Sequence, residues 1–208
     1  MGTATKILIG LVALLVIGGL LIASSYNRLV GLQQATDAQW AQVQNVYQRR
    51  ADLVPNLVST VAGAANFEKS TLEAVTNARA SVGRAQLPAG AAPTDPAQLA
   101  AFQQAQGQLG SALSRLLVVS ERYPDLKATA NFRDLQAQLE GTENRIAVER
   151  GRFNEVVQAY DTSIRRFPAV IFAGMFGFTA RPYFTATQGS ETPPKVQFDF
   201  GGAAPAKP

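Results

Sequence analysis

The fold of this chain is organised around residues 49–58, which read RRADLVPNLV. This stretch lies inside the longest apolar-periodic segment of the sequence, although it carries two arginines, an aspartate and a proline. Proline in a helix interior removes a backbone hydrogen bond and costs about 3 kcal/mol, so a helix that needed only stability would avoid it. The stretch therefore indicates a contact or functional site, and its candidate residues are Arg49, Arg50, Asp52, Pro55 and Asn56.

The segment around this stretch has the period of an α-helix, because its apolar residues recur every three or four positions from Leu29. The positions of the stripe are Leu29, Leu32, Thr36, Trp40, Val43, Tyr47, Ala51, Val54, Val58, Val61 and Ala65. The stripe passes Pro55 in phase, so we expect one helix that is kinked at Pro55 and continues to about Gly83. The alternative is a break at this point, with Asp52 near the N-terminus of a new helix.

The N-terminal part of the chain is predicted to cross a membrane. Residues 7–23 read ILIGLVALLVIGGLLIA, and the uncharged run continues to Asn27. Its length of about 20 residues is that of a transmembrane helix. The alternative is a cleaved signal peptide, but the apolar region is longer than the usual ~7–15 residues and continues into the helical pattern without a linker. Lys6 before the span and Arg28 behind it slightly favour an N-terminus on the inside and the bulk of the chain outside.

A second helix is predicted after a linker of small residues at 85–97. Asp95 followed by Pro96 forms a favourable N-cap and first-turn pair. The following residues step alternately by three and four, which is a heptad seam with polar interruptions. The seam consists of Leu99, Phe102, Gln106, Leu109, Leu113, Leu116, Ser120 and Tyr123. We expect Tyr123 and Pro124 to end this helix and to start the next.

The third predicted helix has the most regular pattern and ends at Pro168. Its seam consists of Leu135, Leu139, Thr142, Ile146, Glu149, Phe153, Val156, Tyr160, Ser163 and Phe167. A repeat of 3.5 residues favours left-handed packing against neighbouring helices. We therefore expect an all-α fold, in which the membrane helix continues into an elongated antiparallel up-and-down bundle of three long helices plus a short fourth.

An apolar segment, AVIFAGMFGF at residues 169–178, follows the third helix and is too short to span a membrane. A first helix that continued to Gly83 would place this segment far from the chain's own membrane. We then expect its large side chains to be an exposed association site, formed by Ile171, Phe172, Met175, Phe176 and Phe178. The alternative is that the segment folds back as a short fourth helix and completes the core.

The C-terminal tail is rich in Pro, Gly and Ala. Within it Val196, Phe198 and Phe200 alternate with polar residues, which is the period of a strand. We expect this strand to pair with a neighbouring chain or to bind in a groove, and the alternative is disorder.

The composition excludes several kinds of active site. The chain contains neither Cys nor His, which rules out a disulfide framework, a catalytic triad as normally built, a zinc site and a Glu-x-x-His di-iron bundle. Glu140 and Glu143 lie three residues apart on one helix and are read as a solvated face rather than a cation site. The 19 basic and 15 acidic residues are interspersed, so nucleic acid is not an expected partner. We predict no catalytic residue, no cofactor and no metal.

Glu149 interrupts the apolar stripe of the third helix. A buried carboxylate needs a paired cation, and we predict a pair with Arg49 or Arg50 of the first helix. Asp52 would complete the cluster through an i, i+3 contact with Arg49. The alternative is that Glu149 reaches the surface and the arginines face water.

Six stretches of the chain carry a resemblance to a known family. They are residues 26–30 (YNRLV), 49–58 (RRADLVPNLV), 72–79 (LEAVTNAR), 123–128 (YPDLKA), 139–148 (LEGTENRIAV) and 165–168 (RRFP) running into 176–178 (FGF). In this order they resemble the LemA family. The resemblance implies a single-span bacterial membrane protein with an up-and-down helical bundle and no established catalytic activity. Glu149 departs from the family, in which a small residue is common at this place.

These observations predict a transmembrane anchor (1–27), a helical bundle (28–178) and an extended tail (179–208). We expect a non-enzymatic protein of the bacterial inner membrane, with its soluble domain on the periplasmic side, that self-associates into a membrane-associated scaffold or compartment. Its expected partners are the lipid bilayer and further copies of itself. The alternative function is an adaptor that binds another membrane protein or a peptide tail.

Overall fold

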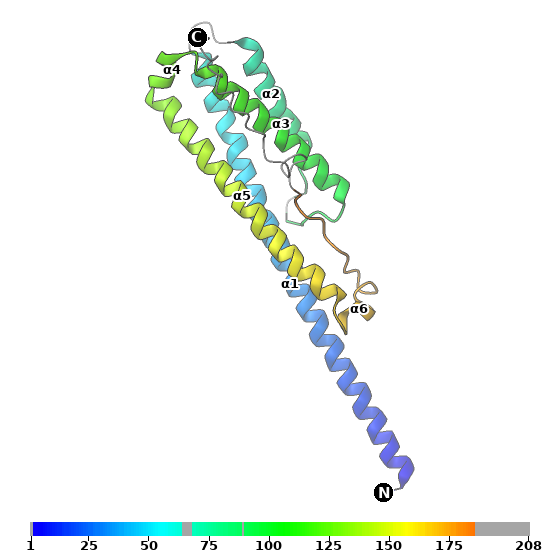
Figure 1. The fold of residues 1–208 in the computed structure, drawn as a ribbon. Coiled ribbons are helices and arrows are strands. Elements are labelled where there is room, and N and C mark those ends of the chain that lie inside the picture. Colours follow the sequence, from blue (N-terminus) through cyan, green and yellow to red (C-terminus); the bar gives the residue numbers. More distant parts are fainter. Residues whose placement is uncertain (1, 64–67, 89, 186–208) are drawn as a thin grey trace, which may run out of the picture.

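The computed structural model describes residues 2–63, 68–88 and 90–185 (Figure 1). Within these ranges the chain is helical and contains no β-strand, which confirms the predicted all-α class. The helices are α1 (Thr3–Ala62), α2 (Lys69–Arg84), α3 (Pro96–Ser120), α4 (Pro124–Ala128), α5 (Ala130–Arg165) and α6 (Ala169–Phe172). The second half of α1 packs with α2, α3 and α5 in an elongated bundle, while its first half extends alone from one end (Figure 1).

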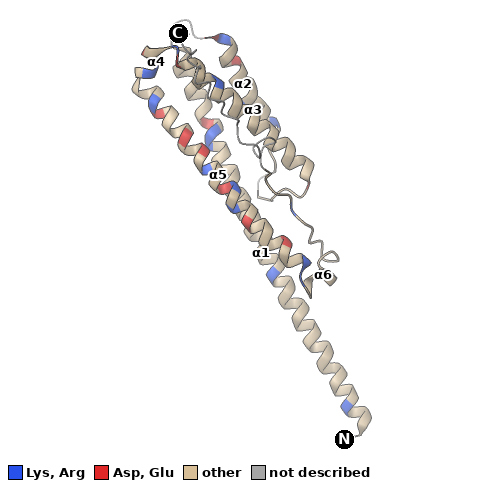
Figure 2. Cartoon of the chain, in the orientation of Figure 1, with Lys and Arg blue, Asp and Glu red and all other residues tan. Residues whose placement is uncertain are grey.

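Helix α1 joins the apolar N-terminal segment to the bundle core without interruption. Its 60 residues correspond to a length of about 90 Å. The apolar window of its first half is long enough to cross a membrane, and none of that window is buried. From Leu29 to Val61 the predicted stripe is buried, except for half-buried Leu32 and Val58, and Trp40, Val43 and Val61 are completely enclosed. The apolar first half carries Lys6 near its start, whereas charges of both signs are interspersed over the bundle (Figure 2).

The predicted extension of the first helix to Gly83 is wrong. Helix α1 ends at Ala62, and α2 begins at Lys69 and packs back against α1. The apolar phase gave no sign of this turn, because α2 also buries one face, through Thr71, Val75 and Val82. The alternative of a break at Asp52 is wrong as well, since α1 passes through Pro55.

The other helix boundaries follow the local signals with one exception. Asp95 accepts a 2.8 Å hydrogen bond from the Ala97 N–H, and Pro96 is the first residue of α3, as predicted. Helix α5 ends before Pro168. The exception is Thr129, whose extended backbone separates the short α4 from α5 and whose hydroxyl accepts from the N–H of Phe132.

The core consists of three clusters along the bundle. The distal cluster is mostly aliphatic and includes Leu57, Leu109 and one aromatic residue, Phe132. The middle cluster is aromatic, and its members Trp40, Phe102, Phe153 and Phe184 are all buried. The third cluster lies at the end nearest the apolar half of α1 and includes Leu29, Tyr160, Phe172 and Phe178.

Residues 179–185 have no regular secondary structure, yet they pack on the bundle through Phe184. The ring of Phe184 stacks on that of Trp40 with 6.0 Å between centroids. The predicted strand residues Val196, Phe198 and Phe200 lie outside the described residues.

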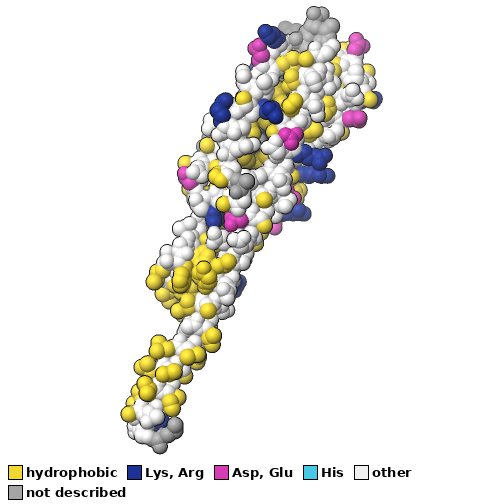
Figure 3. Space-filling model, turned by 180° about the vertical axis from the view of Figure 1, so that it is seen from behind, with side chains coloured by type: hydrophobic (Ala, Val, Ile, Leu, Met, Phe, Trp, Pro, Cys, Tyr) yellow, Lys and Arg dark blue, Asp and Glu magenta, His cyan; other side chains and the backbone are white. Residues whose placement is uncertain are grey.

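The missed turn after Ala62 reverses the direction of everything that follows. Helix α2 returns toward the apolar half of α1, α3 leads away from it, and α5 returns (Figure 1). The expectation that residues 169–178 lie far from the membrane is therefore wrong. The ring of Tyr26 on α1 lies 5.2 Å from that of Phe176 and 5.6 Å from that of Phe178. Apolar side chains gather where the bundle narrows to the single helix (Figure 3).

Candidate functional site

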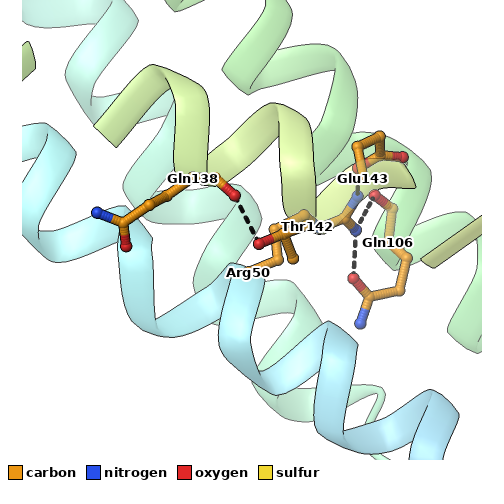
Figure 4. A network of polar contacts seen from close by, with 5 residues as sticks. All are labelled: Arg50, Gln106, Gln138, Thr142 and Glu143. Carbon is orange, nitrogen blue, oxygen red and sulfur yellow. Dashed lines mark hydrogen bonds and ion pairs between the residues drawn. The ribbon is translucent and has the colours of Figure 1, made fainter. Parts of the chain in front are cut away.

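Arg50, the second residue of the RRADLVPNLV stretch, is buried. Its side chain is 4% exposed and lies between α1, α3 and α5 (Figure 4). Its Nη1 donates to the Glu143 carboxylate at 2.9 Å, and its Nη2 donates to the main-chain carbonyl of Gln106 at 3.0 Å and to the side-chain oxygen of that residue. A guanidinium carries five donors in a fixed fork, so it can join three helices through one side chain. Thr142 lies beside it and donates to the carbonyl of Gln138 instead (Figure 4).

The predicted pairing of Glu149 with Arg49 or Arg50 is wrong. Glu149 accepts a 2.6 Å hydrogen bond from Gln39 Nε2 and forms a 2.9 Å ion pair with Arg152 on its own helix. The antiparallel register of α1 and α5 places Arg50 opposite Glu143 and Gln39 opposite Glu149. Arg49, the preceding residue of α1, is exposed.

Asp52 and Asn56 are exposed on α1, and both accept hydrogen bonds from nearby residues of the same helix. The carboxylate of Asp52 accepts from Gln48 at 2.7 Å, so the predicted i, i+3 contact with Arg49 does not form. The main-chain carbonyl of Asn56 accepts the hydroxyls of Ser59 and Thr60. Neither residue is therefore part of the bundle core.

Pro55 has a compensating contact that the sequence reasoning missed. Proline lacks the N–H that would bond to the carbonyl of Ala51 one turn earlier. That carbonyl accepts a 3.0 Å hydrogen bond from Nε of Arg79 on α2. Arg79 is the last residue of the LEAVTNAR stretch. This stretch and RRADLVPNLV both carry the family resemblance, which was the available indication that Arg79 matters.

A polar groove of about 670 Å³ opens beside Arg50, between α1, α3 and α5. It is lined by Tyr47, Gln103, Glu143 and Arg150 among others. Two buried nitrogens here donate no hydrogen bond to any described residue, namely Arg50 Nε and Gln103 Nε2. Burial raises the pKa of the Tyr47 hydroxyl, and the positive charge of Arg150 opposes this shift. The amides of Gln103 and Gln104 and the positive charge of Arg150 in its lining suit the groove to an acceptor group.

A second buried arginine, Arg181, ties the end of the described chain to the bundle. Its N–H donates to Asp161 of α5 at 3.1 Å, and its Nη1 donates to the carbonyl of Ala92 at 2.6 Å. The N–H of Ala92 in turn donates to Asp37 of α1 at 2.8 Å. Burial raises the pKa of the adjacent Tyr160, while the charge of Arg181 opposes this shift. No helical period marks Arg181, so pattern reasoning did not single it out.

The five predicted association residues divide between the core and the surface. Phe172 and Phe178 are buried, which agrees with the alternative of a short fourth helix. Ile171, Met175 and Phe176 are 67%, 84% and 49% exposed, respectively. These three exposed residues lie at the end of the bundle that adjoins the apolar half of α1.

The hydrogen bonds of Arg50 join α1 to α3 and α5. The part of the chain that the structure describes holds no group of three or more His, Cys, Asp or Glu side chains that could bind a metal ion. The polar side chains that bond to Arg50 are the amide of Gln106 and the carboxylate of Glu143.

Comparison with known proteins identifies similar sequences. The sequence model of the LemA family matches residues 39–198. The chain is 27% identical over 183 residues to magnetosome protein MamQ 2 of Paramagnetospirillum magneticum and to magnetosome protein MamQ of Magnetospirillum gryphiswaldense. In both cases the alignment covers 81% of this chain and 67% of the relative.

Proposed function

This chain belongs to the LemA family, and we propose that it is a non-enzymatic membrane scaffold whose copies associate side by side in the plane of the bilayer. The chain itself is a helical protein with one N-terminal helix of transmembrane length and apolarity. Its relatives are magnetosome proteins, and we extend to this chain a structural role at a membrane or membrane compartment.

The observation that carries the proposal is the unbroken passage of α1 from the apolar half into the bundle core. A helix without a joint holds every copy in the same orientation to the bilayer. Anchored copies also share a plane, which raises their effective concentration for one another. Both effects favour lateral contacts between identical faces.

One face of α1 is suited to such contacts because it lacks exposed charge. Between Arg28 and Arg49 the sequence carries a single charged residue, Asp37, whose carboxylate already accepts the Ala92 N–H. The exposed positions in this interval include Gln34, Ala35, Ala38, Gln42 and Asn45. Helix α5, in contrast, carries charges along its length (Figure 2). Interface cores are depleted in Lys, Glu and Asp, because desolvating a charge costs more than desolvating an amide or a methyl group.

The test is the mass of the full chain in detergent or nanodiscs, measured for the wild type and two matched variants. Ala38→Glu places a charge on the charge-poor face of α1. Ala147→Glu places the same charge at an exposed position of α5. We expect the wild type and Ala147→Glu to form multimers and Ala38→Glu to dissociate. A clean wild-type monomer at micromolar concentration would rule out self-association.

The alternative function, an adaptor for another membrane protein, is favoured by the groove beside Arg50. The positive charge of Arg150 and the amides of Gln103 and Gln104 in its lining suit the carbonyl or carboxylate groups of a peptide tail. A monomeric wild type that binds one partner at fixed stoichiometry would favour this function. Gln104→Glu adds a negative charge to the lining and should then weaken that binding.

We further propose a single-pass topology in the bacterial inner membrane, with the N-terminus in the cytoplasm and the bundle in the periplasm. The chain has no cysteine, so a single cysteine at exposed Ser59 gives an unambiguous probe. In intact cells, labelling of Ser59→Cys by a reagent that does not cross the inner membrane is expected. Labelling only after lysis would reverse the orientation.

A further inference from the structure

We propose that residues 165–178, the membrane-proximal segment, make a second contact with the bilayer by inserting their exposed side chains into the lipid interface beside α1. The occupant of this surface is then lipid, rather than another protein. The inference goes beyond the single span, because it assigns a membrane-binding role to a segment far from the span in sequence.

The first argument is the level at which the segment lies. The 21 residues from Ile7 to Asn27 are uncharged and span about 31 Å as a helix, close to the ~30 Å of a bilayer core. Tyr26 therefore lies at the border, where aromatic residues are enriched. The ring of Phe176 contacts Tyr26 at 5.2 Å between centroids. Phe176 also lines a shallow groove together with Ile22 of the span.

The second argument is the continuity of the apolar surface. Ile22 and Tyr26 are exposed on α1, and the large apolar side chains of the membrane-proximal segment extend this surface sideways. These side chains are Phe167, Val170, Ile171, Met175 and Phe176, which are exposed, with Phe167 at 80% and Met175 at 84%. Figure 3 shows the apolar area beside the start of the single helix. Because this apolar surface adjoins the membrane span, we expect it to contact the same lipid that surrounds the span.

The third argument is the sign of the charge at this level. Arg28, Arg165 and Arg166 are exposed at the border, and Arg28 and Arg166 line one groove, together with Glu155. The sequence has no acidic residue before Asp37 and none between Asp161 and Glu191. Basic residues flanking an inserted apolar segment bind the phosphates of anionic lipids. The combination of exposed apolar side chains and a basic border fits a headgroup interface.

With this contact the bundle is attached to the bilayer in two places, through α1 and through the membrane-proximal segment. Buried Phe172 and Phe178 fasten the membrane-proximal segment to α1 and α5, while Ile171 and Met175 remain free for lipid. Lateral association through the charge-poor face of α1 does not depend on this contact, so the two proposals can fail separately.

The experiment measures the depth of single labels in the full chain reconstituted into phosphatidylcholine vesicles with phosphatidylglycerol. Since the chain has no cysteine, an environment-sensitive fluorophore is attached to Ile171→Cys, to Met175→Cys, or to Val118→Cys as the matched control. Val118 is an equally exposed apolar residue at 70%, but it lies at the distal end of α3. Each label is quenched either by aqueous iodide or by a nitroxide carried on lipid.

We expect the labels at 171 and 175 to lose iodide quenching relative to 118 and to gain quenching from the lipid nitroxide. Iodide quenching at 171 and 175 equal to that at 118 would overturn the proposal. Shielding that disappears on dilution of the protein in lipid would overturn it too, because a second copy would then be the occupant. In Arg165→Gln/Arg166→Gln, lipid quenching is expected to lose its dependence on phosphatidylglycerol. If the wild type has no such dependence, the role assigned to the basic border is wrong.

Discussion

Nε of Arg79 donates a 3.0 Å hydrogen bond to the main-chain carbonyl of Ala51. Within α1 this carbonyl has no N–H donor, because residue 55 is a proline. A side chain of α2 therefore provides the missing donor. Pro55 therefore creates the free carbonyl through which α2 forms a hydrogen bond with α1. Its cost in α1 is offset by a contact that an uninterrupted helix would not form.

Arg79→Ala is expected to lower the free energy of unfolding by about 1 kcal/mol, because it leaves the Ala51 carbonyl without a protein donor. Chemical denaturation measures this loss. In a Pro55→Ala background the same substitution should cost almost nothing, since the residue at 55 then provides the N–H. Arg84→Ala, at an exposed position on the same helix, is the control. Equal costs of Arg79→Ala in both backgrounds would contradict the compensation.

Glu143→Ala is expected to destabilise the bundle by about 2 kcal/mol, because buried Arg50 loses its counter-charge. Glu140→Ala removes an exposed carboxylate from the same helix and should stay within about 0.5 kcal/mol. Adding Arg50→Met to Glu143→Ala should recover part of the loss, because an apolar side chain replaces an unpaired buried cation. Thermal unfolding of the four proteins tests the series, and a further loss in the double variant would argue against the pair.

Phe184→Ala is expected to cost about 3 kcal/mol, since it opens a cavity in the middle cluster. Trp40 is the only tryptophan in the sequence, so its fluorescence reports directly on the loss of the stacked ring. Tyr183→Ala, which truncates the partly exposed neighbour, is the matched control and should leave the emission unchanged. An unaltered Trp40 spectrum in Phe184→Ala would mean that residues 179–185 do not pack on the bundle in solution.

The stability of the bundle should fall at alkaline pH in a way that depends on Tyr47. Burial raises the pKa of this hydroxyl above the ordinary value of 10.0. Below pH 10.0 the tyrosine is neutral in both states, so its titration does not alter stability. As the pH rises above this value, the unfolded chain loses the proton first and stability declines toward the folded pKa. The melting temperature of Tyr47→Phe should therefore fall less steeply than that of the wild type above pH 10.0, and equal slopes would refute the assignment.

Local signals in the sequence predicted the helices well. The stripe from Leu29, the cap at Asp95 and the stop at Pro168 rest on residues close together in the chain, and all three appear in the structure. The turn between Ala62 and Lys69 was missed, because the apolar phase of α1 happens to continue into α2. One missed turn was enough to place residues 169–178 at the wrong end of the bundle.

The contacts of Arg50 could be predicted only in part. Its place three residues after Tyr47 and four before Val54 puts it on the buried stripe, whereas Arg49 points about 100° away. The period of α1 alone therefore identifies the buried arginine. The choice between Glu143 and Glu149 depends on the register of α1 against α5, which two separate helical periods do not specify.

The uninterrupted course of α1 has a mechanical consequence. Each residue turns an α-helix by about 100°, so one residue inserted between Tyr26 and Leu29 would rotate the bundle by that angle relative to the span. The contact of Tyr26 with Phe176 would then be lost. Seven inserted residues amount to about two turns and would restore the direction while raising the bundle by about 10 Å. Torque applied to the span within the bilayer is therefore transmitted along α1 as far as Ala62, because the span and the bundle share one continuous helix.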